Sequence, residues 1–170
     1  MIQLTLLRHA HAAWPDHQTR DFDRPLDALG RKGLAVIAPY LARSISAVDR
    51  LLLSPALRAV QSYELLAAHM ALPKPVLDKS LYMASEDQLF DILHAQEDAV
   101  CHLMIIGHNP GLQDMLRHIA PPENAPLHFP TSAFAQLETA GTWAEWAENN
   151  VRLKAFNWPQ NINPDVEADQ

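Results

Sequence analysis

The chain has 170 residues and a mass of 19.0 kDa, the size of one domain that can bury a full hydrophobic core. Hydrophobic residues make up 48% of it and charged residues 19%, which excludes a disordered or fibrous chain, and the net charge of −7 disfavours nucleic acid or an anionic membrane as a partner. The single cysteine, Cys101, excludes an internal disulfide framework and a cysteine-rich zinc site. No apolar run approaches the ~20 residues of a membrane span, and the N-terminus lacks the basic start of a signal peptide. We therefore expect a cytoplasmic protein.

The first part of the chain predicts a strand, a loop and a helix. Residues 2–7 are short, apolar and β-compatible, which is typical of a buried strand. Residues 14–25 are polar and contain two prolines, which predicts a loop. A helix is predicted from the cap Asp27 to about residue 41, and Pro39 is expected to kink or interrupt it.

The middle of the chain repeats this alternation. A second apolar run at residues 51–53 predicts a strand, and a helix is predicted over residues 56–70. Pro55 suits the first turn of that helix, where a missing N–H costs no hydrogen bond. Residues 76–77 predict a minimal third strand, and Ser85 is typical of the cap of a further helix.

The last part of the chain holds the strongest strand pattern, residues 103–106. A helix is predicted after it and ends near residue 119. Residues 121–130 form a proline-rich loop in this interpretation. Residues 133–138 and 151–158 alternate well enough to predict two late strands at a sheet edge.

This order of elements predicts an α/β fold. We expect a three-layer sandwich with a mostly parallel central sheet and one or more antiparallel edge strands. One domain is predicted over residues 1–160, followed by a polar, frayed tail over residues 161–170. Ligands of such sheets bind beyond the carboxyl ends of the strands.

Residues suited to phosphate chemistry follow three of the predicted strands. The first strand ends at Arg8 and His9. The second leads into the helix that carries Arg58, and the strong strand ends just before His108. Guanidinium groups match phosphate oxygens in pairs, and a histidine can attack phosphorus or donate a hydrogen bond to it. Each residue alone has an ordinary explanation on a surface or in a core, but their shared position at strand ends favours an anion pocket.

The segment Leu7-Arg8-His9-Ala10-His11 resembles the Arg-His-Gly signature of the histidine phosphatase superfamily, in its phosphoglycerate-mutase-like branch. Further segments resemble small phosphohistidine phosphatases of the SixA type: Arg24-Pro25-Leu26, Gly30-Arg31-Lys32-Gly33, the run from Leu53 to Ser62, Ile106-Gly107-His108-Asn109-Pro110-Gly111 and Phe129-Pro130-Thr131. Together these motifs extend over nearly the whole chain. The resemblance implies a phosphoglycerate-mutase-like fold.

The resemblance also implies a role for each central residue. His9 matches the nucleophile that is transiently phosphorylated, and Arg8 and Arg58 match the arginines that clamp the phosphoryl oxygens. His108 matches the second histidine, which contacts the phosphoryl group in transit. We expect the two arginines to disfavour protonated His9, and the other ring nitrogen of His9 to donate to a backbone carbonyl.

Ser54 and Asn109 lie in the same motifs and are predicted to help bind the substrate. The resemblance implies that no metal and no other cofactor is needed, and cationic side chains can neutralise the transferred phosphoryl group in place of a metal. The expected partner is a phosphorylated protein of the histidine phosphotransfer type or a small phosphorylated molecule.

One departure from the family pattern concerns the acid that many relatives place before a motif like Leu81-Tyr82. Lys79 stands where the glutamate is expected. An alkoxide leaving group needs a proton donor, whereas the imidazole of phosphohistidine needs less help. The missing acid therefore favours a phosphohistidine substrate, unless Asp78 or Asp16 replaces it.

Other polar residues have two interpretations each. His9 and His11 form a His-x-His pair of the kind that binds metal in amidohydrolase barrels. Those (β/α)₈ barrels need roughly 250 residues, which disfavours a metal hydrolase. Asp21, Asp23 and Arg24 either form an internal ion network that orders the loop or lie on an exposed surface.

Three residues after the proline-rich loop, His128, Thr131 and Ser132, are candidates for the pocket mouth. Two alternatives to a phosphohistidine phosphatase stay open: a small-metabolite phosphomonoesterase on the same scaffold, and a catalytically inactive phosphate-binding module. All four central residues are present, which favours an active enzyme.

Overall fold

The computed structural model describes residues 1–120, 127–147 and 150–168 and centres on one six-stranded sheet. The strand order is β3-β2-β4-β1-β5-β6. The strands are β1 (Ile2–Arg8), β2 (Arg50–Leu53), β3 (Val76–Leu77), β4 (His102–Gly107), β5 (Phe134–Thr139) and β6 (Val151–Asn157).

The sheet is mostly parallel, as predicted. Strand β1 pairs with β4 in parallel, and β4, β2 and β3 continue in the same direction. Strands β5 and β6 are antiparallel additions beside β1. The expectation that both late strands lie at the edge was wrong for β5, which is buried between β1 and β6. Its six residues are all buried, whereas β6 alternates between half-buried and exposed residues as an edge strand does.

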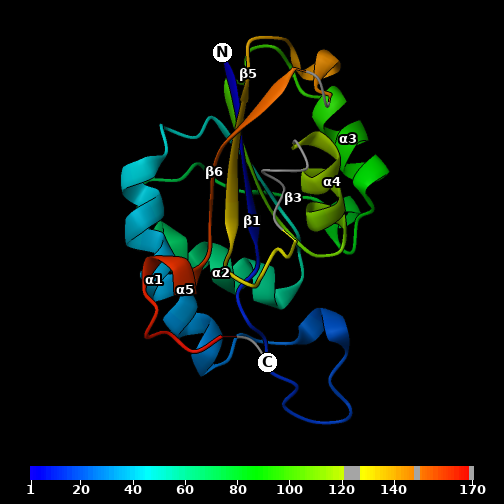
Figure 1. Cartoon of the computed structure of the whole chain (residues 1–170). Helices are drawn as coiled ribbons and strands as arrows, with labels where there is room; N and C mark the ends of the chain where they lie inside the picture. Colours follow the sequence, from blue (N-terminus) through cyan, green and yellow to red (C-terminus); the bar gives the residue numbers. More distant parts are fainter. Residues whose placement is uncertain (121–126, 148–149, 169–170) are drawn as a thin grey trace.

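Helices cover both faces of the sheet, which gives the three predicted layers (Figure 1). The helices are α1 (Ala28–Ser44), α2 (Leu57–Ala67), α3 (Glu86–His94), α4 (Gly111–Ile119) and α5 (Pro159–Ile162), with short 3₁₀ helices η1 (Asp21–Asp23), η2 (Lys79–Leu81) and η3 (Trp143–Glu145). Helices α1, α2 and α5 lie on one face, and α3 and α4 lie on the other (Figure 1). No helix within the described residues is both long and apolar enough to cross a bilayer.

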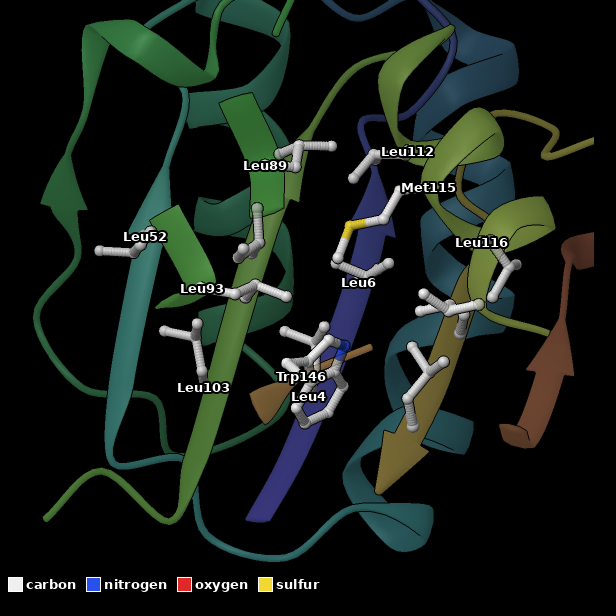
Figure 2. Close-up of a cluster of buried hydrophobic side chains, with 14 of the residues drawn as sticks. Leu4, Leu6, Leu52, Leu89, Leu93, Leu103, Leu112, Met115, Leu116 and Trp146 are labelled. Carbon is white, nitrogen blue, oxygen red and sulfur yellow. The ribbon is translucent and has the colours of Figure 1, made fainter. Parts of the chain in front are cut away.

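The two-residue period of the strands divides the core into two clusters. In β1, Leu4 and Leu6 pack under α3 and α4, as Figure 2 shows, while Leu7 packs toward α1 and α2. In β4, Leu103 belongs to the first cluster and Met104 to the second. The central strands are therefore apolar on both faces, which explains their continuous hydrophobic runs.

Local capping signals in the sequence agree with the helix starts. The carboxylate of Asp27 accepts a hydrogen bond from the Gly30 amide at 2.9 Å, and Ser85 forms a capping box with Gln88. Pro55 lies before helix α2 and not in its first turn, because the helix is capped at Ala56.

Two other local expectations need correction. Pro39 lies inside α1, which runs on to Ser44, three residues beyond the predicted end. The predicted tail over residues 161–170 is not simply frayed, because its first two residues belong to α5, which packs against α1. The domain boundary at residue 160 stays a prediction.

Candidate active site

The carboxyl ends of three neighbouring strands bring the predicted residues to one level. In the register of the sheet, Arg8 at the end of β1 lies opposite Gly107 at the end of β4. The amide of His9 donates to the carbonyl of Gly107 at 3.1 Å. The amide of Ser54, just after β2, donates to the carbonyl of Ile106 at 3.1 Å. Parallel pairing therefore brings His9 and His108 together, as the strand-end argument predicted, and it places Ser54 beside them.

A cavity of about 430 Å³ opens at this edge of the sheet. The residues that line it are Arg8, His9, His11, Ala12, Asp21, Arg24, Arg58, Met83, His108, Asn109 and Thr131. Five of the six residues predicted to form the site are among them. The exception is Ser54, which is fully buried and lies behind His108 instead of facing the cavity.

The two ring nitrogens of His9 have different partners: one is hydrogen-bonded to the backbone and the other to Arg58. Its Nδ1 lies 2.7 Å from the carbonyl oxygen of Ala10, an acceptor, so Nδ1 carries the proton and donates. Its Nε2 accepts a hydrogen bond from Nε of Arg58 at 3.2 Å. The expected backbone acceptor is therefore Ala10, and Nε2 is the nitrogen that holds the free electron pair.

Arg58 is the central group of the site. It lies in the first turn of α2 and is only 3% exposed. Besides the contact with His9, its Nη2 lies 3.3 Å from Nδ1 of His108. Its Nη1 and Nη2 donate to the carbonyl and the carboxylate of Asp21 at 2.5 and 2.9 Å. One buried guanidinium thus joins two imidazoles and one carboxylate.

These contacts also decide the tautomer of His108. Because Nδ1 accepts from Arg58, the proton of the neutral ring lies on Nε2. Nε2 is 2.6 Å from Oγ of Ser54 and donates to it. Ser54 accordingly supports His108 from below, and the two histidine ring centroids lie 4.9 Å apart.

Arg8 and Asn109 share one backbone acceptor. Nη1 of Arg8 and Nδ2 of Asn109 each donate to the carbonyl of Phe129 at 2.9 Å. Phe129 is fully buried, so this carbonyl lies within the packed interior. The Phe129-Pro130-Thr131 motif therefore positions two cavity residues and contributes Thr131 itself to the wall.

Asp21 is a site residue that sequence reasoning left undecided. Its carboxylate accepts hydrogen bonds from Arg58, from Arg24 at 3.0 Å and from the hydroxyl of Tyr82 at 2.6 Å. Burial by itself would raise the pKa of Asp21, but these three donors outweigh it and hold the pKa well below the usual range. The same hydrogen bond raises the pKa of Tyr82. Asp21 is therefore a permanent anion inside the cavity wall.

Both histidines are held in the neutral form by their surroundings. Burial, followed by the neighbouring His108, lowers the pKa of His9 well below its ordinary value, with smaller contributions from Arg58 and Arg8. Burial and then the charge of Arg58 lower the pKa of His108 to about 3. The arginines act in the predicted direction, but desolvation is the larger cause.

The remaining candidates lie away from the cavity. Asp16 and Asp78 are occupied by local turn hydrogen bonds and do not line it, and Lys79 is exposed. Asp23 pairs with Arg20 on the surface.

The candidates that follow the proline-rich loop are divided. Thr131 lines the cavity, Ser132 is buried and its amide donates to the His9 carbonyl at 3.2 Å, and His128 lines a separate surface depression. Residues 121–126 of that loop lie outside the described residues.

No group of three or more His, Cys, Asp or Glu side chains among the described residues is arranged to hold a metal ion. In the His-x-His pair, Nδ1 of His9 donates a hydrogen bond to the carbonyl of Ala10. Nδ1 of His11 donates one to the carboxylate of Asp27 at 2.6 Å.

Comparison with known proteins agrees with this fold. The model of the histidine phosphatase superfamily (branch 1) matches residues 4–81. An uncharacterized protein of Mycobacterium tuberculosis is 32% identical over 163 residues, which cover 91% of this chain and 100% of that protein. The structure of a putative phosphohistidine phosphatase SixA from Agrobacterium tumefaciens is 29% identical, with a TM-score of 0.79 over 92% of this chain and 97% of that one. A protein histidine phosphatase SixA complexed with tungstate is 25% identical, with a TM-score of 0.78 over 95% and 99%.

The buried neutral histidines predict a specific loss of stability in acid. The unfolded chain binds protons at His108 near the ordinary pKa of 6.5, whereas the folded protein binds one only near 3. The contribution of His108 to the free energy of unfolding is therefore fully present above pH 6.5 and falls as the pH drops from there toward 4. Asp21 begins to contribute only at lower pH. We expect His108→Gln to reduce this slope by up to ~1.4 kcal/mol per pH unit in denaturant titrations. Exposed His17, as His17→Gln, is the control; equal slopes for wild type and His108→Gln would contradict the prediction.

Proposed function

Because the chain belongs to the histidine phosphatase superfamily and is a phosphatase, we propose that it hydrolyses phosphohistidine in a protein, without a metal, through a phosphoryl intermediate on its own His9. The observation that carries this proposal is the state of His9. Its Nδ1 proton is held by the Ala10 carbonyl, so the Nε2 electron pair lies at the base of a cavity beside the two predicted clamping arginines.

The first chemical step is attack of His9 Nε2 on phosphorus. The P–N bond of the substrate breaks, and its electron pair returns to the substrate imidazole, which leaves as a neutral ring when its other nitrogen carries a proton. The low pKa of His9 keeps Nε2 unprotonated and ready to attack. Holding the donor in place is the main task of such a site, because phosphoryl transfer depends on positioning and charge neutralisation.

The arginines neutralise the phosphoryl group. Arg58 donates to His9 and His108, and an incoming phosphoryl group takes these donors for its oxygens and frees the His9 electron pair. Arg8 lines the same cavity. The charge of a bound dianion also favours protonation of His108, which then adds a further cationic donor.

The substrate class follows from what the cavity offers the leaving group. Its described lining residues include no glutamate, and its one carboxylate, Asp21, is a low-pKa anion that cannot donate a proton near neutral pH. Phosphohistidine needs no such donor, whereas an alkyl ester does. Of the two similar proteins, the one at 29% identity is named a putative phosphohistidine phosphatase. The one at 25% is named a protein histidine phosphatase and was solved with tungstate, an oxyanion like phosphate.

The nucleophile can be identified by trapping. A protein substrate carrying ³²P-phosphohistidine is expected to leave acid-labile label on the wild-type chain, and His9→Ala is expected to trap none and to lose turnover. His9 follows a strand end and lies at the cavity, so the variant is expected to keep the wild-type circular dichroism spectrum. Label on another residue, or label retained by His9→Ala, would remove His9 from this role.

The clamp depends on the planar fork of arginine. Arg58→Lys keeps the charge but cannot serve His9, His108 and Asp21 together, so we expect kcat/KM to fall about 10²-fold or more. The exposed Arg20→Lys is the matched control and is expected to stay at the wild-type value. Near-wild-type kcat/KM for Arg58→Lys would place the phosphoryl group elsewhere.

The leaving group decides the rate of the first step if no acid is present. In a series of phosphate esters at fixed pH, kcat/KM is expected to fall steeply from acidic phenols to simple alkyl alcohols, by the ~10²–10⁴-fold that general-acid catalysis is typically worth. Phosphohistidine is expected to rank with the good substrates. A flat series would reveal a proton donor and favour a small-metabolite phosphomonoesterase.

A further inference from the structure

The cavity holds an imidazole that the steps above do not use. His11 lies two residues after His9 on the extended segment that follows β1, and Ala10 between them is fully buried in the core beneath α1 and α2. His9 and His11 accordingly face the cavity, while Ala10 faces the opposite side. Two residues of extended chain span about 6.6 Å. His11 and the nucleophile therefore lie two residues apart on the wall of one cavity of about 430 Å³, which is large enough to hold a phosphoryl group and a water molecule.

The position of this imidazole is set by several contacts with the start of α1. Nδ1 of His11 donates to Oδ2 of Asp27 at 2.6 Å. The other carboxylate oxygen of Asp27 accepts from the Gly30 amide, and the Asp27 amide donates to the His11 carbonyl at 3.3 Å. A Cβ at Gly30 would lie only 2.2 Å from that carbonyl oxygen, so the helix approaches the segment as closely as glycine permits. This packing fixes the backbone of His11 against the start of α1, and the hydrogen bond to Asp27 orients its ring.

The hydrogen bond to Asp27 decides which nitrogen of His11 is basic. Because Nδ1 keeps its proton and donates it in a hydrogen bond to the carboxylate, Nε2 of the neutral ring holds the electron pair. The side chain is 34% exposed, so water reaches it. A carboxylate that orients an imidazole in this way is the arrangement of general bases that activate water or a hydroxyl group.

We propose that His11 is the general base that activates the water which hydrolyses the phosphoryl group on His9, and that Asp27 is its positioning residue; this rests on the proposed function. The water oxygen forms a bond to phosphorus, and the water proton moves to Nε2 of His11. The P–N bond breaks, and its electron pair returns to Nε2 of His9, which leaves neutral because its Nδ1 proton stays with Ala10. Hydrogen phosphate departs, and His11 passes the proton to solvent.

The other titratable groups of the described cavity wall are less suited to this step. Asp21 is bound to two guanidinium groups and a phenol, and its lowered pKa makes it a weak base. Nδ1 of His108 accepts a hydrogen bond from Arg58, and its Nε2 carries a proton that it donates to the hydroxyl oxygen of Ser54. Asp16 and Asp78 lie outside the cavity.

The test separates the two chemical steps with p-nitrophenyl phosphate, whose acidic phenol leaves without a proton donor. In His11→Gln we expect phosphorylation of His9 to continue and dephosphorylation to slow about 10²-fold or more. Stopped-flow traces are then expected to show a burst of one p-nitrophenolate per active site, followed by slow turnover. Quenching during turnover is expected to give near-stoichiometric acid-labile phosphate on His9, well above the wild-type level.

Asp27→Asn is the second variant because asparagine is an equally good helix cap. It keeps the acceptor for Gly30 but loses the carboxylate that holds His11, so we expect phosphoenzyme to accumulate with a smaller loss of rate. The exposed His17→Gln is the control and is expected to match wild type in both phases.

Three outcomes would overturn the assignment. They are unchanged turnover in His11→Gln, an equal loss of burst and turnover, and a fall in rate without accumulation of phosphoenzyme. If the wild-type enzyme is labelled on His9 and any of these results is found, only the role of His11 is rejected. Wild-type enzyme that never labels His9 rejects the proposed function, and with it the base.

Discussion

The buried guanidinium of Arg58 is the group around which this site is organised. A charge that is 3% exposed is costly unless its hydrogen bonds are satisfied, and here the loop between β1 and α1 satisfies them through the carbonyl and carboxylate of Asp21. Because Arg24 and Tyr82 bind the same carboxylate, one charged contact joins the first turn of α2, the 3₁₀ helix η1 and the segment after η2. The cavity wall is thus built from distant parts of the chain by a single electrostatic requirement.

The same arrangement prepares the site for a dianion. Burial and the arginine charges keep His9 and His108 neutral, so the cavity presents basic nitrogens and cationic donors together. Asp21 offsets part of the charge of Arg58 and keeps its guanidinium group oriented toward the two imidazoles. Preorganised donors of this kind stabilise charge in a transition state without reorganising when the substrate reacts. Ser54 and the Phe129 carbonyl serve the same end, because each holds a cavity side chain from a fully buried position.

The start of helix α1 combines a helix cap with a contact to the proposed base. Asp27 caps α1 with one oxygen and binds His11 with the other. A helix start that would be needed in any fold of this class therefore also orients an imidazole at the cavity. Gly30 permits this, because its missing side chain lets the first turn of α1 contact the segment that carries both histidines.

The sequence by itself determined the order of the elements, their caps and the convergence of His9, Arg58 and His108. These features depend on local periodicity, on the capping residues Asp27 and Ser85, and on the rule that parallel strands end at one edge. The tertiary structure alone decided that Ser54 lies behind His108 and that Asp21 enters the cavity while Asp23 stays on the surface. It also decided that His11 meets Asp27 and that β5 is an interior strand. The reason is that these residues are placed by contacts between segments far apart in the chain, and side-chain patterns carry no record of which distant partner a loop or a strand will meet.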